Sequence, residues 1–95
     1  MLTIIIYDIE ETKNRNNVIK KLRHYGLKRI QKSAFRGNLK QDQRNTLKEK
    51  LEENILSQKD SIIQIEICAS CKEHITQLGN SETLQEEEKE YEVLI

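Results

Sequence analysis

The chain has 95 residues, of which 36% are hydrophobic and 34% charged, enough for one small domain. A domain of this size buries only about 60–65% of its unfolded surface, so oligomerisation is a common way for it to enlarge its core. No apolar run approaches the roughly 20 residues of a membrane span, and no basic segment precedes the first apolar run. We therefore expect a cytoplasmic protein in which Cys68 and Cys71 are reduced.

The net charge of zero hides a strong asymmetry. Residues 1–50 carry thirteen basic and five acidic side chains, a balance of +8, whereas residues 51–95 carry three basic and eleven acidic ones, a balance of −8. This division predicts a basic surface for a polyanion and a separate acidic segment. The alternative is that the two halves neutralise each other on the folded surface.

The first half predicts a strand, a helix and further extended structure. Residues 2–9 form a short, isoleucine-rich run typical of a central strand buried on both faces. Residues 13–25 place their apolar side chains on one helical face, and Gly26 is suited to end that helix. Residues 27–39 are expected to be extended, as a hairpin or as one bulged strand, with a bulge or turn at Gly37.

The second half predicts a helix within residues 40–56, because Leu47, Leu51 and Ile55 share one stripe. A half-exposed strand follows, in which Ile63, Ile65 and Ile67 alternate with polar residues. Residues 70–78 suggest a short helix or an irregular connection, and residues 79–81 a turn. An acidic linker over 82–90 and a short strand over 91–95 would end the chain.

The predicted order of elements is that of an α+β, ferredoxin-like βαββαβ sandwich. We assign residues 1–81 to this domain and residues 82–95 to the acidic linker and an extra C-terminal strand. Because an exposed sheet edge invites pairing, this strand is expected to be swapped in a homodimer.

Three segments of the sequence, Ile5–Ile9, Tyr25–Gln31 and Ser33–Leu39, together with Asp60–Ile62, resemble the CRISPR-associated protein 2 family. The resemblance implies a ferredoxin-like homodimer whose C-terminal strand crosses to the other protomer. Members of the family bridge two dimers of the CRISPR integrase and hold new spacer DNA, and several are described as magnesium-dependent endonucleases on RNA or DNA. The acid that the resemblance assigns to catalysis and to Mg²⁺ is Asp8.

Asp8 follows a buried strand, where a carboxylate can hold Mg²⁺ with the help of several waters. Two Asp8 side chains across a dimer axis would make a minimal metal site. The alternative is that Asp8 merely begins the turn into the next helix. Glu10 and Glu11 are better explained as acids near a helix N-terminus than as metal neighbours.

Basic side chains are dense between residues 13 and 36 and predict nucleic-acid binding through the phosphate backbone. The candidates are Arg15, Lys20, Lys21, Arg23, Lys28, Arg29, Lys32 and Arg36. Double-stranded DNA is the expected ligand, with single-stranded RNA as the other candidate. The acidic end of the chain is expected to dock the integrase through Glu86, Glu87, Glu88, Tyr91 and Val93.

Cys68 and Cys71, with His74 three residues further on, make half of a zinc site, which needs four ligands. Two copies meeting in a dimer could complete such a site, whereas a thioredoxin-type redox role would need a βαβ setting around the motif. The simplest interpretation is that both are small, partly buried thiols. His24 at a helix end is expected to interact with the helix dipole.

We therefore expect a CRISPR spacer-acquisition protein, a dimeric nucleic-acid-binding scaffold with Mg²⁺-dependent endonuclease activity. The alternatives are a toxin-type ribonuclease of the related VapD group and a non-enzymatic, ferredoxin-like regulatory or metal-binding module.

Overall fold

The computed structural model describes residues 1–79 of the chain. The elements in this range are β1 (Leu2–Asp8), α1 (Thr12–His24), β2 (Lys28–Gln31), β3 (Ala34–Asn38), α2 (Gln41–Glu52), β4 (Ser61–Ile67) and α3 (Ala69–Lys72). The predicted linker over 82–90 and the predicted strand over 91–95 lie outside the described residues.

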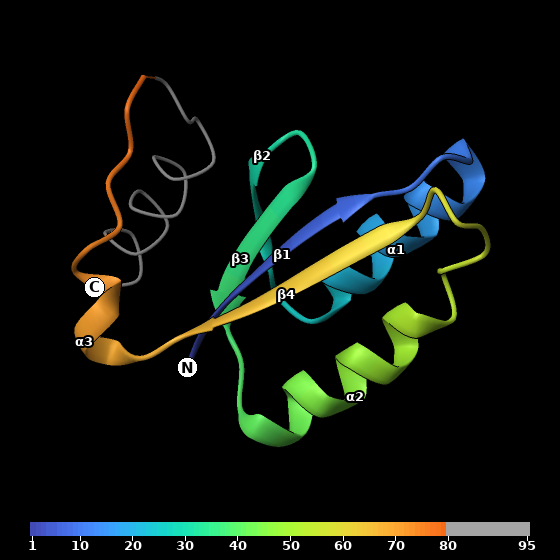
Figure 1. The fold of residues 1–95 in the computed structure, drawn as a ribbon. Coiled ribbons are helices and arrows are strands. Elements are labelled where there is room, and N and C mark those ends of the chain that lie inside the picture. Colours follow the sequence, from blue (N-terminus) through green and yellow to red (C-terminus); the bar gives the residue numbers. More distant parts are fainter. Residues whose placement is uncertain (80–95) are drawn as a thin grey trace.

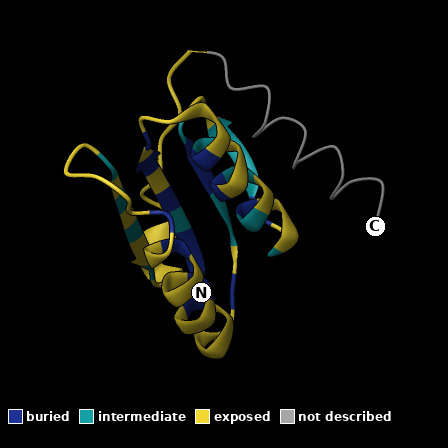
Figure 2. Cartoon of the chain, turned by 90° about the vertical axis from the view of Figure 1, so that its right-hand side faces the viewer, coloured by how far each residue is buried: buried dark blue, intermediate teal, exposed yellow. Residues whose placement is uncertain are grey.

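The four strands form one antiparallel sheet in the order β2-β3-β1-β4 (Figure 1). β1 lies between β3 and β4, as its apolar sequence predicts. Helices α1 and α2 pack on one face of the sheet, and the buried residues lie between the two layers (Figure 2). The predicted ferredoxin-like sandwich is confirmed.

Helix α1 ends through local backbone chemistry. Gly26 adopts a left-handed conformation with φ of 81° and donates its N–H to the Arg23 carbonyl at 2.9 Å. The N–H of Leu27 reaches back to the Leu22 carbonyl at 3.1 Å, which completes a Schellman motif. Leu22 and Leu27 both enter the core, so the motif also directs the chain back toward the sheet.

The segment after α1 is a hairpin, which resolves the alternative that the sequence left open. Its irregularity lies in β2, between Arg29 and Gln31, and the predicted bulge or turn at Gly37 is wrong. Gly37 sits inside β3, where an added Cβ would lie 2.7 Å from Leu27 Cδ2 and 3.2 Å from Leu27 Cα. The glycine therefore allows Leu27 to pack closely over the strand.

The two faces of the sheet differ in a way that corrects two predictions. β1 turns Ile5 and Tyr7 into the core, but Ile6 on its other face is 39% exposed, so the strand is not buried on both faces. In β4 the side chain that packs on the core is Ile62, whereas Ile63 and Ile65 are exposed. The half-exposed character of β4 is confirmed, but the isoleucines expected to face the core, Ile63 and Ile65, lie on the exposed face.

Candidate active site

Asp8 is the last residue of β1 and lies opposite Ser61, the first residue of β4. Side chains alternate along a strand, and Ile5 and Tyr7 point toward the helices. Asp8 therefore lies on the opposite face, which no helix of the described part of the chain covers, and it is exposed. A carboxylate in this position is accessible to a ligand that approaches the sheet.

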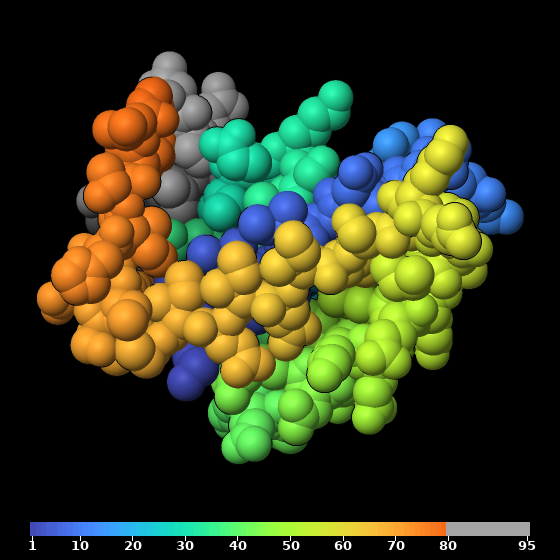
Figure 3. Space-filling model, viewed as in Figure 1, coloured from blue at the N-terminus to red at the C-terminus, as the bar shows by residue number. Residues whose placement is uncertain are grey.

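The same face carries four isoleucines, which we call the open-face patch: Ile4, Ile6, Ile63 and Ile65. The sheet register sets Ile4 opposite Ile65 and Ile6 opposite Ile63, so the four are direct cross-strand neighbours. Ile63 is 54% exposed, and Ile6 and Ile65 are each 39% exposed. Figure 3 shows atoms of β1 and β4 reaching the surface in the middle of this face. A contiguous apolar patch of this kind is typical of a protein interface.

Two of the predicted basic residues lie at the Asp8 end of the sheet. Arg15 donates from Nη1 to the Ile9 carbonyl at 3.4 Å and from Nη2 to Thr12 Oγ1 at 3.0 Å. Lys32 is held in the β2–β3 turn, where its carbonyl accepts the Tyr7 hydroxyl at 3.1 Å. The first turn of α1 and the β2–β3 turn thus place Arg15 and the backbone of Lys32 at this end of the sheet.

The other basic candidates are spread over different surfaces. Lys28 and Arg36 are register partners on the open face, and the Arg29 guanidinium carbon lies 5.4 Å from the centre of the Phe35 ring. Lys20 and Arg23 lie on α1, outside the buried stripe of that helix. The structure therefore does not gather the eight basic residues into one patch.

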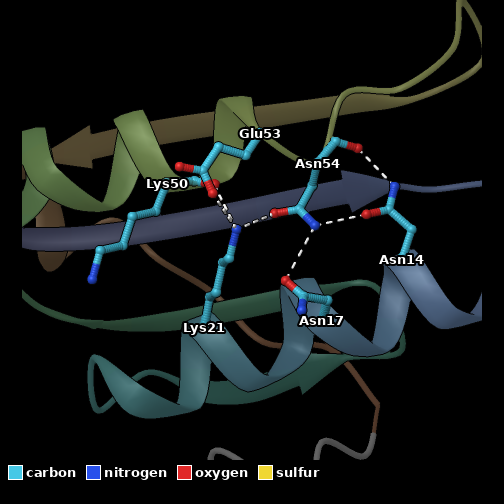
Figure 4. A network of polar contacts seen from close by, with 6 residues as sticks. All are labelled: Asn14, Asn17, Lys21, Lys50, Glu53 and Asn54. Carbon is cyan, nitrogen blue, oxygen red and sulfur yellow. Dashed lines mark hydrogen bonds and ion pairs between the residues drawn. The ribbon is translucent and has the colours of Figure 1, made fainter.

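Lys21 has a structural role. Its ammonium group donates to the Lys50 carbonyl and to Asn54 Oδ1, both at 2.7 Å, and lies 3.4 Å from Glu53 (Figure 4). These contacts join α1 to the end of α2. They occupy the ammonium group that we had expected to bind nucleic acid.

The acids near Asp8 do not complete a metal site within one chain. Among residues 1–79, no cluster of three or more His, Cys, Asp or Glu side chains is arranged to hold a metal. Glu10 forms an ion pair with Lys59 at 3.6 Å, and Glu11 occupies the N-cap of α1 without a side-chain cap bond. Mg²⁺ is commonly bound by one or two carboxylates plus waters, and the exposed Asp8 carboxylate is a donor of this kind.

Asp60 fixes the chain connections at this end of the sheet, a role that sequence reasoning missed. Its carboxylate accepts the N–H groups of Glu10 and Leu56 at 3.0 Å and of Ser57 at 3.2 Å. These backbone donors, Glu10 first, hold the pKa of Asp60 below its ordinary value. The sequence signal was a short polar turn ahead of a strand, which alone does not identify these donors.

This geometry predicts a specific pH dependence of stability. Folding lowers the pKa of Asp60. The carboxylate therefore stabilises the folded protein above the pKa that Asp60 has in the unfolded chain, and this stabilisation is lost as the pH falls through its pKa in the folded protein. The gap in unfolding free energy between the wild type and Asp60→Asn should therefore narrow as the pH falls from 5 toward 2. Urea unfolding at several pH values measures this difference in unfolding free energy. A difference that stays constant with pH would contradict the role given to the Asp60 carboxylate.

The cysteines and His24 lie away from Asp8. Cys68 and Cys71 are both exposed, so the prediction of partly buried thiols is wrong. His24 lies in the last turn of α1, as predicted, with its ring 5.8 Å from that of Tyr25 in an edge-on arrangement. In the described range, 1–79, no helix has the length and apolar character that crossing a membrane requires.

Comparison with known proteins settles the family. The family model described as CRISPR associated protein Cas2 matches residues 1–75. The chain belongs to the Cas2 family. A protein of Methanospirillum hungatei named CRISPR-associated endoribonuclease Cas2 1 is 35% identical over 91 residues, which cover 96% of this chain and 94% of the relative. A protein of the same name from Archaeoglobus fulgidus is 32% identical, covering 85% of this chain and 86% of its own length.

The fold agrees with that of solved Cas2 proteins. The crystal structure of Streptococcus pyogenes Cas2 at pH 6.5 matches with a TM-score of 0.71 and 24% identity, covering 83% of this chain and all of that one. At this identity the match supports the fold alone. The resemblance to the Cas2 family inferred from the short segments is confirmed.

Proposed function

We propose that this Cas2 family member is a metal-dependent endoribonuclease of a CRISPR system, which acts as a homodimer joined through the open-face patch. The observation that carries the proposal is that Asp8 and the patch lie on the same uncovered face of the sheet. The relatives named endoribonuclease support the type of activity.

The dimer supplies what a single chain lacks. A two-fold interface uses the same surface on both copies, so joining two open-face patches brings two Asp8 carboxylates to one interface. The four isoleucines would be covered, which removes apolar surface from water at about 25 cal/mol per Å². The two carboxylates would hold Mg²⁺, and the bound ion would supply an activated water and charge stabilisation at a scissile phosphate.

The chain's own basic groups would bind and position the nucleic acid. Arg15 in α1 and Lys32 in the β2–β3 turn belong to segments at the Asp8 end of β1, and their charges would meet the phosphate backbone there. Binding of this kind is strongly salt-dependent and shows little sequence preference. Within residues 1–79 the aromatic residues are Tyr7 and Phe35 in the core and Tyr25 packed against it, so base stacking contributes little.

A scaffold role in spacer acquisition is the second part of the proposal. Lys20 and Arg23 project from α1, in the layer opposite the open face, so a dimer joined through the sheets leaves them available to double-stranded DNA. The acidic residues proposed to dock the CRISPR integrase, Glu86 to Glu88 with Tyr91 and Val93, lie outside the described residues.

A charge placed in the patch tests the proposal. Ile6→Glu should convert the dimer to a monomer in light scattering and abolish Mg²⁺-dependent cleavage of single-stranded RNA, because dimerisation would bury the carboxylate unpaired. Leu56→Glu is the matched control, since Leu56 is 66% exposed in the connection between α2 and β4. The control should stay dimeric and active. A dimeric, active Ile6→Glu protein, or wild-type cleavage that persists in a chelator, would contradict the proposal.

A further inference from the structure

The two cysteines meet at the point where the chain leaves the sheet. Cys68 follows β4 and is the N-cap of α3, and Cys71 lies in the single turn of that helix. The N–H of Cys71 donates to the Cys68 carbonyl at 3.0 Å. A turn closed by such a bond keeps its end Cα atoms within about 7 Å, a range that overlaps the 4.4–6.8 Å of disulfides.

The hydroxyl of Ser70, between the two cysteines in sequence, lies 3.2 Å from Cys68 Sγ. Both cysteines are exposed, so an external reagent can reach them. Neither thiol takes part in the site around Asp8.

We propose that Cys68 and Cys71 form a reversible thiol–disulfide site, in which Cys68 reacts first with an external disulfide and Cys71 resolves the product. The co-reactant is a low-molecular-weight disulfide or a disulfide of another protein. The Cys68 thiolate attacks one of its sulfurs, which forms a mixed disulfide and releases the first thiolate. Cys71 then loses its proton and attacks Cys68 Sγ, which forms the internal disulfide and releases the second thiolate. The co-reactant is thereby reduced to two thiols as the chain is oxidised by two electrons.

The two thiols differ in the way that this division of roles requires. Hydrogen bonds from Ser70 and Cys71 lower the pKa of Cys68 to about 7, whereas the neighbouring Cys68 sulfur raises the pKa of Cys71 above its ordinary value. A thiol with a pKa near the ambient pH is the most effective attacker in exchange. The order of reaction therefore follows from the asymmetry of the pair.

The position of the pair separates it from the proposed nuclease site. Ser61 lies beside Asp8, and Cys68 comes seven residues later, just after the end of β4, a distance of about 23 Å at 3.3 Å per residue. The disulfide would fix the turn from which the C-terminal segment departs. Its formation is expected to leave RNA cleavage by the Asp8 site intact, so failure of either proposal can be recognised independently of the other.

Oxidation of the full chain by glutathione disulfide at pH 7 tests the proposal. Lys59 and Lys72 bracket both cysteines, so trypsin releases them in one peptide, residues 60–72. The expected product is this peptide lighter by two hydrogen atoms, restored by a thiol reductant. In single variants, glutathione should add to Cys68 of Cys71→Ser about five to ten times faster than to Cys71 of Cys68→Ser.

Ser70→Ala provides a further check. Removing the hydroxyl should slow the reaction of Cys68 while leaving the dimer and the far-ultraviolet spectrum unchanged, which a purely structural role for Ser70 would not predict. Equal reaction rates of the two cysteines, or oxidation that yields only stable glutathione adducts or links between chains, would overturn the proposal. A failure of both cysteines to react with glutathione disulfide would also overturn the proposal.

Discussion

Replacing Asp8 by asparagine is expected to lower the rate of Mg²⁺-dependent RNA cleavage by about two to three orders of magnitude. The change keeps the size of the side chain but removes the carboxylate proposed to hold the metal. Metal stabilisation of transition-state charge is worth several kcal/mol, and each 1.36 kcal/mol is about tenfold in rate. Single-turnover cleavage of a labelled RNA, measured at saturating protein, reports this loss directly.

The structure gives the Asp8 experiment its controls. Asp8 is exposed, so Asp8→Asn should leave the unfolding free energy within about 0.5 kcal/mol of the wild type and the dimer intact. Asp42→Asn makes the same chemical change in the first turn of α2, in the helical layer away from Asp8, and should cleave at the wild-type rate. Full activity of Asp8→Asn would remove Asp8 from the mechanism.

A large loss of stability is expected on substitution of Asn54, which joins the two helices (Figure 4). The Asn54 carbonyl accepts Asn14 Nδ2 at 2.7 Å, and its side-chain amide donates to Asn14 Oδ1 at 2.6 Å. Its Oδ1 accepts the Lys21 ammonium group at 2.7 Å. Asn14 and Asn54 are both buried, so these bonds are shielded from water.

Asn54→Ala should lower the free energy of unfolding by about 3 kcal/mol. The substitution leaves Asn14 Oδ1 buried without its donor and removes one acceptor from the Lys21 ammonium group, and an unsatisfied buried polar group costs about 1–3 kcal/mol, more when it is charged. Urea unfolding followed by circular dichroism measures the change, provided that the protein concentration is held fixed for a dimer.

Asn17→Ala is the matched control for this prediction. Asn17 accepts the Asn54 amide through a longer bond of 3.3 Å from a position nearer the solvent. Its loss should cost less than about 1 kcal/mol. Equal losses for Asn17→Ala and Asn54→Ala would show that the buried pair does not anchor α2 to α1.

The features that the sequence predicted well are those set by local chemistry. The length and the isoleucines of residues 2–9 identify a central strand, and Gly26 marks the end of α1 because few other residues adopt its backbone angles. Asp8 could be placed at a strand end because it comes at the end of the isoleucine-rich run. The sequence could not show that Asp8 lies on the uncovered face of the sheet, because that depends on which face the helices occupy.

The features that the sequence did not predict depend on register and long-range contact. β4 offers isoleucine to both faces, at Ile62 and Ile63, so alternation alone could not decide which one enters the core. The bonds that join Arg15 to the Ile9 carbonyl and the Lys32 carbonyl to the Tyr7 hydroxyl could not be inferred from spacing in the sequence. Lys20 and Lys21 are adjacent lysines that the sequence does not distinguish. The position of Lys21 on the helix directs its side chain to Asn54.

Mixed dimers of wild-type and Asp8→Asn chains test the central claim most directly. After subunit exchange at equal amounts and constant total protein, a site built from both Asp8 carboxylates should cleave RNA at about one quarter of the wild-type rate, because only dimers with two wild-type copies are active. The activity should follow the square of the wild-type fraction as that fraction is varied. A linear dependence, with about one half of the rate at equal amounts, would show that each Asp8 acts alone.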